Sequence, residues 1–372
     1  MIESGEWCVI SFQKLCILEL KLTAAALLDR YKHRDIPLRE YLHMYAKIMR
    51  TLCASRIEDV YHQGKAMLDA DVVLKSDHLK VSDDKADPIL VVVVRDDLLR
   101  MQLLFDHYRR IGVHQFIVMD NCSTDGTLEY AMGQSDTRVY QVRTKYFTTA
   151  KEGWVEYAMR RVGVNRWFLV VDSDEMLDYP GSEGHPVQEL IAEQLKLGNT
   201  RLNGYMLDML SDQPLYAVTC GPLEIPRVFK WFSCDNYQIK HALYGMNIIT
   251  GGPRQKLVSK KVWAGKCPLF YFSDEMTNLN AHFQYPLVPI SHTNVCLVLR
   301  HYKYLATDKR VYEERATQES GFGSTAEIYS QINSSAAADS PVSLLDEACR
   351  EYQTSYSLTA LPLLYVTFPR EE

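Results

Sequence analysis

The sequence predicts an α/β protein built on a doubly wound, mainly parallel sheet with helices on both faces. The first observation is the run ILVVVV at Ile89–Val94, because such an unbroken, mostly β-branched run is typical of a central parallel strand. The second is that short apolar runs alternate with helical stretches from there to about residue 199. The third is that polar residues follow each apolar run directly, where a sheet of this kind binds its ligands.

The spacing of apolar residues predicts the helices and strands between residues 89 and 199. Apolar residues at helical spacing in 98–112 predict an amphipathic helix, and Asp125 can cap a short helix at Thr127–Met132. A later helix is expected to open with Pro186 at its first position and to end before Gly198. Its expected inward-facing residues are Val187, Leu190, Ile191 and Leu195. The remaining elements expected here are strands at 116–119, 139–142 and 167–171 and a helix at 152–162.

The regular alternation stops after Asn199. Further strands, mixed in direction, are expected at 205–210, 227–232, 255–263 and 295–299, followed by a helix at 305–319 with its charges outward. Apolar residues recur at helical spacing between residues 38 and 52. We therefore expect a helical N-terminal region of unknown role at 1–85, the α/β domain at 86–330 and a C-terminal extension at 331–372.

Composition limits the function classes. The chain has 372 residues, is 47% hydrophobic and carries a net charge of −6, so no overall basic surface points to nucleic acid as a partner. Nine cysteines without a zinc-type cluster suggest free thiols in a reducing compartment. The apolar N-terminal stretch lacks a basic start, and Lys14, Glu19 and Lys21 interrupt it. We expect a cytoplasmic protein without a transmembrane segment, and leave peripheral membrane contact open.

The fourth predicted strand runs directly into Asp172, Ser173, Asp174 and Glu175. If the strand continues through them, Asp172 and Asp174 point to the same side and offer two hard oxygen ligands to Mg²⁺ or Mn²⁺. The alternative is a surface turn in which the aspartates cap a helix. No G-x-G-x-x-G follows the first strand and no phosphate-binding P-loop motif occurs, which argues against both of those nucleotide sites.

The second predicted strand runs into DNCSTDGT, residues 120–127. Turn-forming residues are needed at any strand-to-helix connection, so this segment has a purely structural interpretation. The functional interpretation is that Asp120 and Asp125 accept hydrogen bonds from a base or a ribose. The residues by themselves do not decide between the two.

Four segments in order carry a family resemblance. VVRDDLLRMQLLFDHYRRIGVHQFIVMDNCSTDGT, RWFLVVDSDEML, GGPRQKL and LRHYKYLATDKRVYEERA together resemble the nucleotide-sugar glycosyltransferases of the GT-A fold, in particular the family 2-like group. The resemblance covers roughly residues 89–329. It implies that Asp172 and Asp174, the DxD motif, hold a divalent metal on the sugar-nucleotide diphosphate, with His301 completing the metal shell. It further implies that Arg95, Asp120, Asn121 and Asp125 line the nucleotide pocket.

The function implied is transfer of a sugar from a nucleotide-diphosphate donor to a carbohydrate or other hydroxyl acceptor, with metal and with inversion. A carboxylate has to deprotonate the acceptor. Asp274 lies at a plausible distance along the chain, with Asp208 and Asp212 as rivals. Two other functions stay open, namely a metal-dependent nucleotidyltransferase and a non-catalytic binding subunit of GT-A type. The turn Arg95-Asp96-Asp97 counts against the first, because such enzymes usually carry a Gly- and Lys/Arg-rich loop there.

Overall fold

The computed structural model describes residues 71–146, 148–241, 247–274, 276–280, 282–285, 295–317, 326–336 and 342–369. The expected N-terminal helices fall outside these residues as far as residue 70. The last part of that region was expected to be helical too, but Val72–Asp77 forms a strand, β1, which pairs antiparallel with β4 (Thr137–Val142). The β-branched Val72 and Val73 favour a strand, and they are half-buried while Leu74 is exposed, as suits an edge strand.

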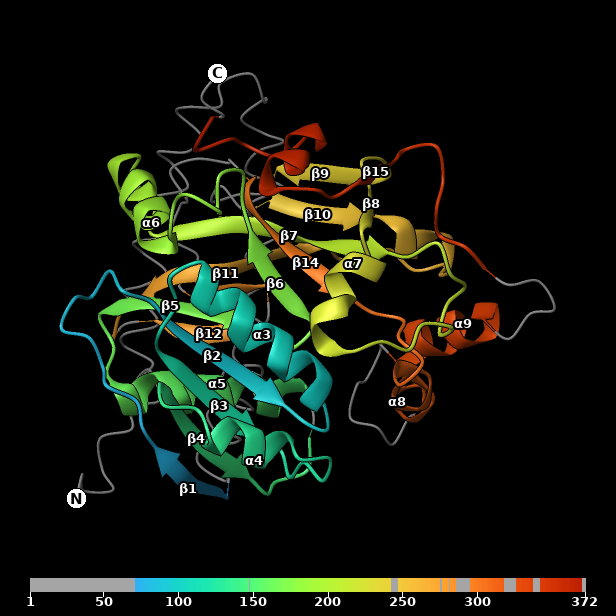
Figure 1. The fold of residues 1–372 in the computed structure, drawn as a ribbon. Helices are drawn as coiled ribbons and strands as arrows, with labels where there is room; N and C mark the ends of the chain where they lie inside the picture. Colours follow the sequence, from blue (N-terminus) through green and yellow to red (C-terminus); the bar gives the residue numbers. More distant parts are fainter. Residues whose placement is uncertain are drawn as a thin grey trace, which may run out of the picture.

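A sheet of eleven strands runs through the described part of the chain (Figure 1). Its main path has the order β1-β4-β3-β2-β5-β11-β7-β14-β6. The strands of the first half are β2 (Ile89–Val94), β3 (Phe116–Asp120), β4 and β5 (Arg166–Val171). All four pair in parallel, which confirms the doubly wound arrangement expected from the alternating apolar runs.

Helices cover both faces of this parallel part of the sheet. The side chains of β2 illustrate the reason, since they divide between the two core clusters. Its residues Leu90 and Val92 belong to the core cluster that also holds apolar residues of α3 (Leu98–Arg110). Ile89 and Val91 belong to the opposite cluster, with residues of α5 (Thr148–Val162). Successive side chains of a strand point to opposite faces, so a strand without polar residues must be buried on both. The short helix α4 (Thr127–Met132) and α6 (Val187–Lys196) lie on the α3 side.

The second half extends the sheet in mixed directions, as expected after Asn199. The strands here are β6 (Glu175–Asp178), β7 (Arg201–Leu210), β11 (Gly265–Phe272) and β14 (Val295–Tyr302). β11 is antiparallel to both β5 and β7, β14 is parallel to β7, and β6 is antiparallel to β14. Six strands of the main path, β2, β3, β4, β5, β7 and β14, therefore point the same way and end at one edge. Their common direction confirms the expected fold class.

Two expected strands in this half are wrong. Residues 227–232 divide between the helix α7 (Ile225–Val228) and β8 (Trp231–Ser233). Residues 255–263 begin in a 3-10 helix, Pro253–Lys256, and continue as a loop with a single bridge from Trp263 to Thr250. Pro253 presets the first position of that 3-10 helix and removes a strand hydrogen-bond donor. The apolar residues there pack into the core from a loop, which periodicity does not distinguish from a strand.

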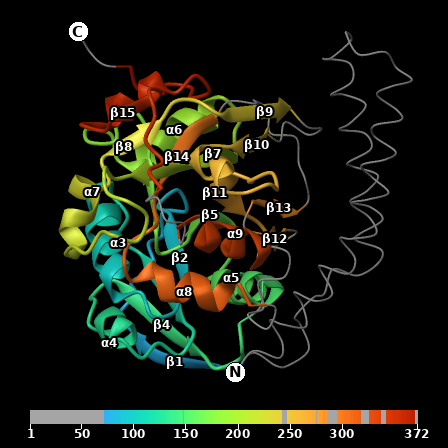
Figure 2. The same ribbon diagram turned by 90° about the vertical axis from the view of Figure 1, so that its right-hand side faces the viewer.

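Smaller elements complete the described part. A hairpin pairs β9 (Tyr237–His241) with β10 (Asn247–Gly251), and a second pairs β12 (Thr277–Asn280) with β13 (Phe283–Tyr285). The expected helix at 305–319 is shorter, α8 (Asp308–Arg315), and it lies beside α9 (Ala326–Ala336) in both views (Figures 1 and 2). The C-terminal segment pairs β15 (Cys349–Glu351) with β8 and closes against the sheet.

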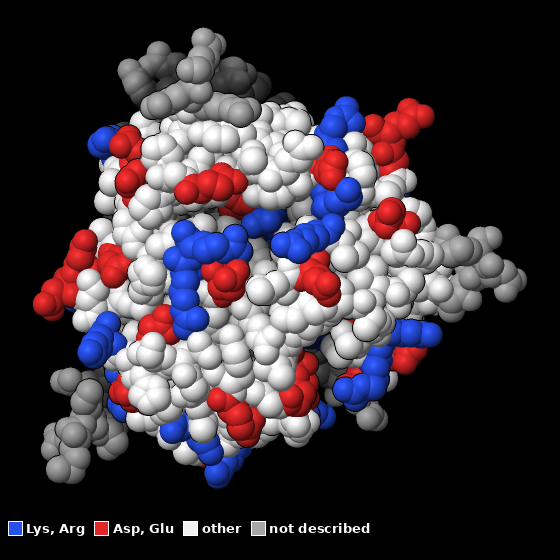
Figure 3. All heavy atoms as spheres, viewed as in Figure 1, with Lys and Arg blue, Asp and Glu red and all other residues white. Residues whose placement is uncertain are grey.

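The helix α6 corrects one expected core residue. Leu195 is exposed, and Gln194 is buried in its place, donating to Thr367 in the C-terminal segment. Pro186 caps α6 instead of opening it from its first position. Among the described residues, the helices are all too short or too polar to cross a membrane. On the face shown in Figure 3, acidic and basic side chains are interspersed and form no extended basic patch among the residues described.

Candidate functional site

A pocket of about 600 Å³ opens at the edge where the six codirectional strands end. Its lining includes residues of the segments that follow β2 and β5 and residues of α8 and α9. These two helices lie on the side to which the β2 arrow points in Figure 1. Its charged lining residues are Arg95, Asp96, Asp97, Arg100, Lys151, Asp172, Asp174, Lys303, Asp308, Arg310, Glu314 and Arg315. The pocket therefore lies where a parallel sheet is expected to bind its ligand.

The two aspartates of the DxD motif lie in a turn, not on a continued strand. β5 ends at Val171, and Glu175 N donates to Asp172 O at 3.1 Å to close the turn into β6. Ser173 Oγ donates to Asp97 Oδ2 at 2.5 Å, which holds the middle of the turn against the start of α3. The premise that Asp172 and Asp174 project from one side of a strand is thus incorrect.

The carboxylates of Asp172 and Asp174 contact different residues. Asp172 contacts Lys151 and lies 3.2 Å from Lys266 Nζ. Asp174 Oδ2 accepts from Lys303 Nζ at 2.8 Å and lies 3.4 Å from His301 Nε2. Of the three residues expected to bind metal, only Asp174 and His301 are therefore in contact with each other.

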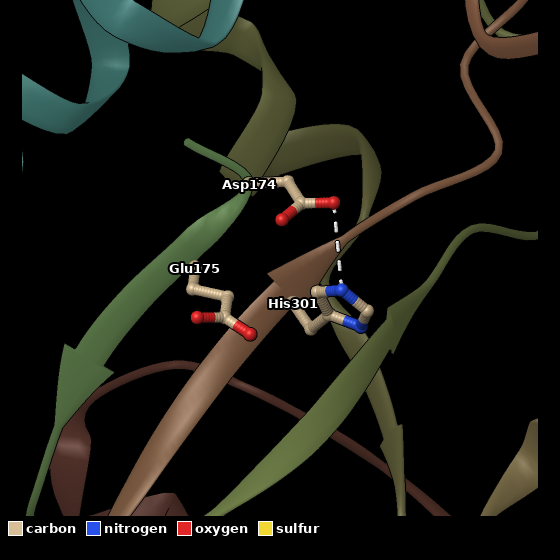
Figure 4. Close-up of side chains that lie close together, drawn as sticks. All are labelled: Asp174, Glu175 and His301. Carbon is tan, nitrogen blue, oxygen red and sulfur yellow. Dashed lines mark ion pairs between the residues drawn. The ribbon is translucent and has the colours of Figure 1, made fainter. Parts of the chain in front are cut away.

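Sheet register brings two further carboxylates to His301. His301 on β14 pairs with Glu175 on β6 and with Asp208 on β7, so the three residues form a row across neighbouring strands. All three are almost fully buried. The ligand atoms of Asp174, Glu175 and His301 lie within 4.8 Å of one another, and Figure 4 shows their side chains gathered at the ends of β6 and β14.

Hydrogen bonding decides which nitrogen of His301 is available. Nδ1 lies 2.8 Å from Asp208 Oδ1, and since a carboxylate only accepts, Nδ1 carries the hydrogen. In the neutral ring, Nε2 is then a lone pair that faces the Asp174 carboxylate at 3.4 Å. Two acceptors face each other comfortably only when a proton or a metal ion lies between them. Two carboxylates and an imidazole, with Asp208 orienting the ring from behind, fit Mn²⁺ or Mg²⁺.

The electrostatics of the carboxylates follow from their burial and their cations. Burial by itself would raise the pKa of Asp174, but Lys303 holds it well below the usual aspartate range, and a protonated His301 would lower it further. Burial likewise opposes ionisation of Asp208, yet Arg254, whose Nε donates at 2.8 Å, and His301 keep the pKa of Asp208 lowered. Asp97 is the opposite case, since burial raises its pKa despite the nearby Arg100. Asp174 and Asp208 are thus charged at neutral pH.

Two of the expected nucleotide residues have unsatisfied acceptors at the end of β3. Asp120 is fully buried, and its Oδ2 accepts from Ser123 N at 3.0 Å while Oδ1 has no hydrogen-bond partner. Asn121 lines the pocket, donates from Nδ2 to the carbonyls of Val142 and Thr144, and leaves Oδ1 without a partner. A buried acceptor without a donor is costly, and of these two residues only Asn121 lines the pocket.

The other two expected nucleotide residues differ from this pair. Asp125 accepts at Oδ2 from Leu98 N, the first residue of α3, and at Oδ1 from Thr127. It therefore caps α3 across space and supports the start of α4, which matches the structural interpretation of DNCSTDGT for this residue. Arg95 lines the pocket, is more than half exposed and lies 3.5 Å from Asp96.

The structure does not bring Asp274 to this site. β11 is antiparallel to β5, so Phe272 pairs with Arg166 at the start of β5, and Asp274 follows at the edge opposite Asp172. Asp274 is exposed there. Its position in the sequence suggested that Asp274 is the catalytic base. Because β11 runs antiparallel to β5, Asp274 instead lies a strand length away from Asp172. Of the rivals, Asp212 is exposed and Asp208 is committed to His301 and Arg254.

Sequence reasoning gave no role to Glu175, Lys151, Lys266 or Lys303, and named Asp208 only as a rival base. Glu175 had a signal, since it belongs to the acidic cluster after β5. Lys303 had one as well, since it directly follows His301 and Tyr302 in the segment LRHYKYLATDKRVYEERA, whereas Lys151 and Lys266 are isolated residues on other elements. Only the folded chain brings the three lysines to the same three carboxylates.

Comparison with known proteins identifies no family for this chain. No protein-family model matches the chain, and no curated protein sequence matches it. A solved structure of 4-diphosphocytidyl-2C-methyl-D-erythritol synthase from Anaerococcus prevotii is similar over 50% of this chain and 72% of its own, with 12% identity and a TM-score of 0.22. A superposition of that quality supports no statement about function, so the family resemblance stays a prediction.

Proposed function

We propose that the protein is a metal-dependent glycosyltransferase that moves a sugar from a nucleotide-diphosphate donor to an acceptor hydroxyl. The observation that carries the proposal is the Asp174, Glu175 and His301 group beside a pocket at the common end of the codirectional strands. The unsatisfied acceptor of Asn121, which lines the pocket, supports a nucleotide as part of the donor. Inversion at the anomeric carbon belongs to the proposal because the family 2-like group implies it.

Each group has a role in this mechanism. Asp174, Glu175 and His301 would hold Mn²⁺ or Mg²⁺, which supplies Lewis-acid stabilisation of the charge on a departing diphosphate. Asp208 keeps the proton on His301 Nδ1, so that Nε2 stays a ligand. The Ser173–Asp97 hydrogen bond fixes the turn that carries Asp174. Because Asp274 lies at the other edge, we propose that a carboxylate lining the pocket takes the acceptor proton instead.

A metal-dependent nucleotidyltransferase is the second candidate, and one observation favours it. The loop after β2 is Arg95-Asp96-Asp97, but lysines from other elements, Lys151 and Lys303, reach the same pocket. Cations for a triphosphate therefore do not have to come from that loop. The two reactions share the metal site and differ in the bond that breaks and in the product released.

Product analysis tests the proposal. The protein is incubated with Mn²⁺ and either a panel of sugar nucleotides or the nucleoside triphosphates, with and without sugar acceptors. Release of a nucleoside diphosphate from a sugar nucleotide is the expected result. Release of pyrophosphate from a triphosphate would instead establish nucleotidyl transfer. Thermal unfolding with the same ligands tests the non-catalytic alternative, since a ligand at about 100 times its Kd adds roughly 2.7 kcal/mol of stability whether or not it reacts.

Asp208→Asn is expected to lower the affinity for Mn²⁺ by about 10- to 100-fold. The amide keeps the size of the side chain but loses the charge, and because His301 Nδ1 and Arg254 Nε contact different oxygens of Asp208, one of them would face an NH₂ donor. Isothermal titration with Mn²⁺ measures the effect, and the unfolding temperature shows whether the variant is folded. Asp212→Asn, which neutralises an exposed aspartate just beyond the same strand, is the matched control. A folded Asp208→Asn protein that binds Mn²⁺ as tightly as Asp212→Asn would contradict the positioning role of Asp208.

A further inference from the structure

Three lysines neutralise the three carboxylates of the turn after β5. Lys151 contacts Asp172, Lys303 Nζ lies 2.8 Å from Asp174 Oδ2, and Lys266 Nζ lies 2.6 Å from both oxygens of Glu175. The lysines come from α5, from the residue after β14 and from β11. The three positive charges therefore balance the three negative charges before any ligand binds.

The three lysines are not equivalent. Lys266 is almost fully buried, does not line the pocket, and bridges Glu175 and Asp172 from behind. Lys151 and Lys303 do line the pocket, and their side chains are 15% and 12% exposed. Lys266 thus contacts the turn from outside the pocket, whereas Lys151 and Lys303 can reach a ligand in the pocket with a small rotation of a flexible side chain.

This arrangement has an electrostatic consequence for a divalent cation. A metal ion that binds Asp174 and His301 has to approach the ammonium of Lys303, and it competes with that ammonium for the same Asp174 oxygen. Like charges at such short range are unfavourable, most of all in a site with little water. The metal alone should therefore bind weakly while Lys303 stays on Asp174.

An anion with several oxygens reverses this balance. Phosphate oxygens offer Lys151 and Lys303 acceptors that carry charge, and lysine binds phosphate well as a point charge. Once the ammonium of Lys303 leaves the turn, the charge of Asp174 is uncovered for the metal. The anion and the metal then assist each other, and the coupling has to be equal in both directions.

From this geometry we infer that Lys151 and Lys303 are binding residues for a diphosphate, and that they move from the carboxylates of the turn to its oxygens when it enters the pocket. The inference rests on the proposed function for the identity of the pocket and deepens it by naming the anion class that the lysines recognise. It also makes the lysines a gate for the metal, since Lys303 opposes the metal until the diphosphate draws it away.

The test measures Mn²⁺ and inorganic pyrophosphate separately, so that complexes of the two in solution do not interfere. Isothermal titration is done with Mn²⁺ alone and with pyrophosphate alone on wild type, Lys303→Met and Lys151→Met. Lys303→Met is expected to bind Mn²⁺ at least about 5-fold more tightly and pyrophosphate at least about 5-fold more weakly than wild type. Lys151→Met is expected to weaken pyrophosphate binding to a similar degree. Unfolding of a variant would lower its affinity for both ligands. Tighter Mn²⁺ binding together with weaker pyrophosphate binding in one variant would therefore identify the movement of the lysine from carboxylate to diphosphate, called the exchange below.

Two controls make the result specific. Lys309→Met removes the same charge from an exposed position on α8 outside the pocket, and it should change neither affinity. Lys303→Arg keeps the charge and should retain pyrophosphate binding. If wild type binds Mn²⁺ and pyrophosphate but Lys303→Met shifts neither, or shifts both downwards while still folded, the exchange is refuted and the proposed function stands. If wild type binds neither ligand, the proposed function fails together with the exchange.

Discussion

Asp174→Asn is expected to abolish Mn²⁺-dependent ligand binding, with a loss of at least about 100-fold in metal affinity and in kcat/KM for sugar transfer. Asp174 is the carboxylate that faces the free nitrogen of His301 and also lines the pocket. An amide nitrogen in its place offers no charge and can turn a donor towards the metal. Titration with Mn²⁺ and the transfer assay both report the change. The stabilisation by Mn²⁺ plus a nucleoside diphosphate in thermal unfolding should disappear with them.

The Mn²⁺ affinity of Asp172→Asn is compared with that of Asp174→Asn, to decide which of the two aspartates binds the metal. The DxD pattern predicts that Asp172 and Asp174 bind the metal together, whereas the structure groups Asp174 with Glu175 and His301 and pairs Asp172 with two lysines. From the structure we expect the Asp172 variant to lose much less Mn²⁺ affinity than the Asp174 variant. Equal losses would restore Asp172 as a direct ligand. Unchanged Mn²⁺ affinity in Asp174→Asn would remove the metal site from this turn altogether.

The second large effect is on stability, at Arg100. Its side chain is almost fully buried in the first turn of α3. It donates to Asp97 at 3.1 Å and to the carbonyl of Tyr302 at 2.9 Å, and it pairs with Asp308 on α8. This one guanidinium ties the first helix, the end of β14 and the pocket wall together. Burial would disfavour its charge, but Asp97 and Asp308 keep the pKa of Arg100 above its usual value.

Arg100→Met is expected to lower the free energy of unfolding by about 3–5 kcal/mol, because it leaves two buried carboxylates without their cation. At roughly 2–4 °C per kcal/mol for a domain of this size, Tm should fall by about 6–20 °C. Denaturant titration and calorimetry give the two values. Arg110→Met is the control from the same helix, since Arg110 forms an exposed pair with Asp106 and its loss should cost at most about 1 kcal/mol. If Arg100→Met lowered the free energy of unfolding by a similarly small amount, water would have to replace the contacts of Arg100 in solution.

The strand and helix pattern of residues 89–171 could be predicted because each element there is marked by its own residues. Ile89–Val94 and Thr127–Met132 have the expected bounds, since an unbroken apolar run and a turn-to-helix boundary are local signals. Local sequence patterns gave wrong predictions where a residue packs against a segment that is distant in the chain. Leu195 fits the apolar stripe of α6, but the C-terminal segment takes up Gln194 instead. Residues 255–263 are apolar enough for a strand, yet they form a 3-10 turn and a packed loop.

The same division applies to the candidate site. That a buried strand ends in Asp172, Ser173, Asp174 and Glu175 at the ligand edge is readable from the residues, because the position of an apolar run relative to an acidic one is a local property. Which of these carboxylates meets His301 depends on how the strands pair. Glu175, His301 and Asp208 are far apart in the chain, and the pairing of β6, β14 and β7 places them in one row. The lysines that balance the turn arrive from three further elements, since charge neutrality is a property of the assembled site.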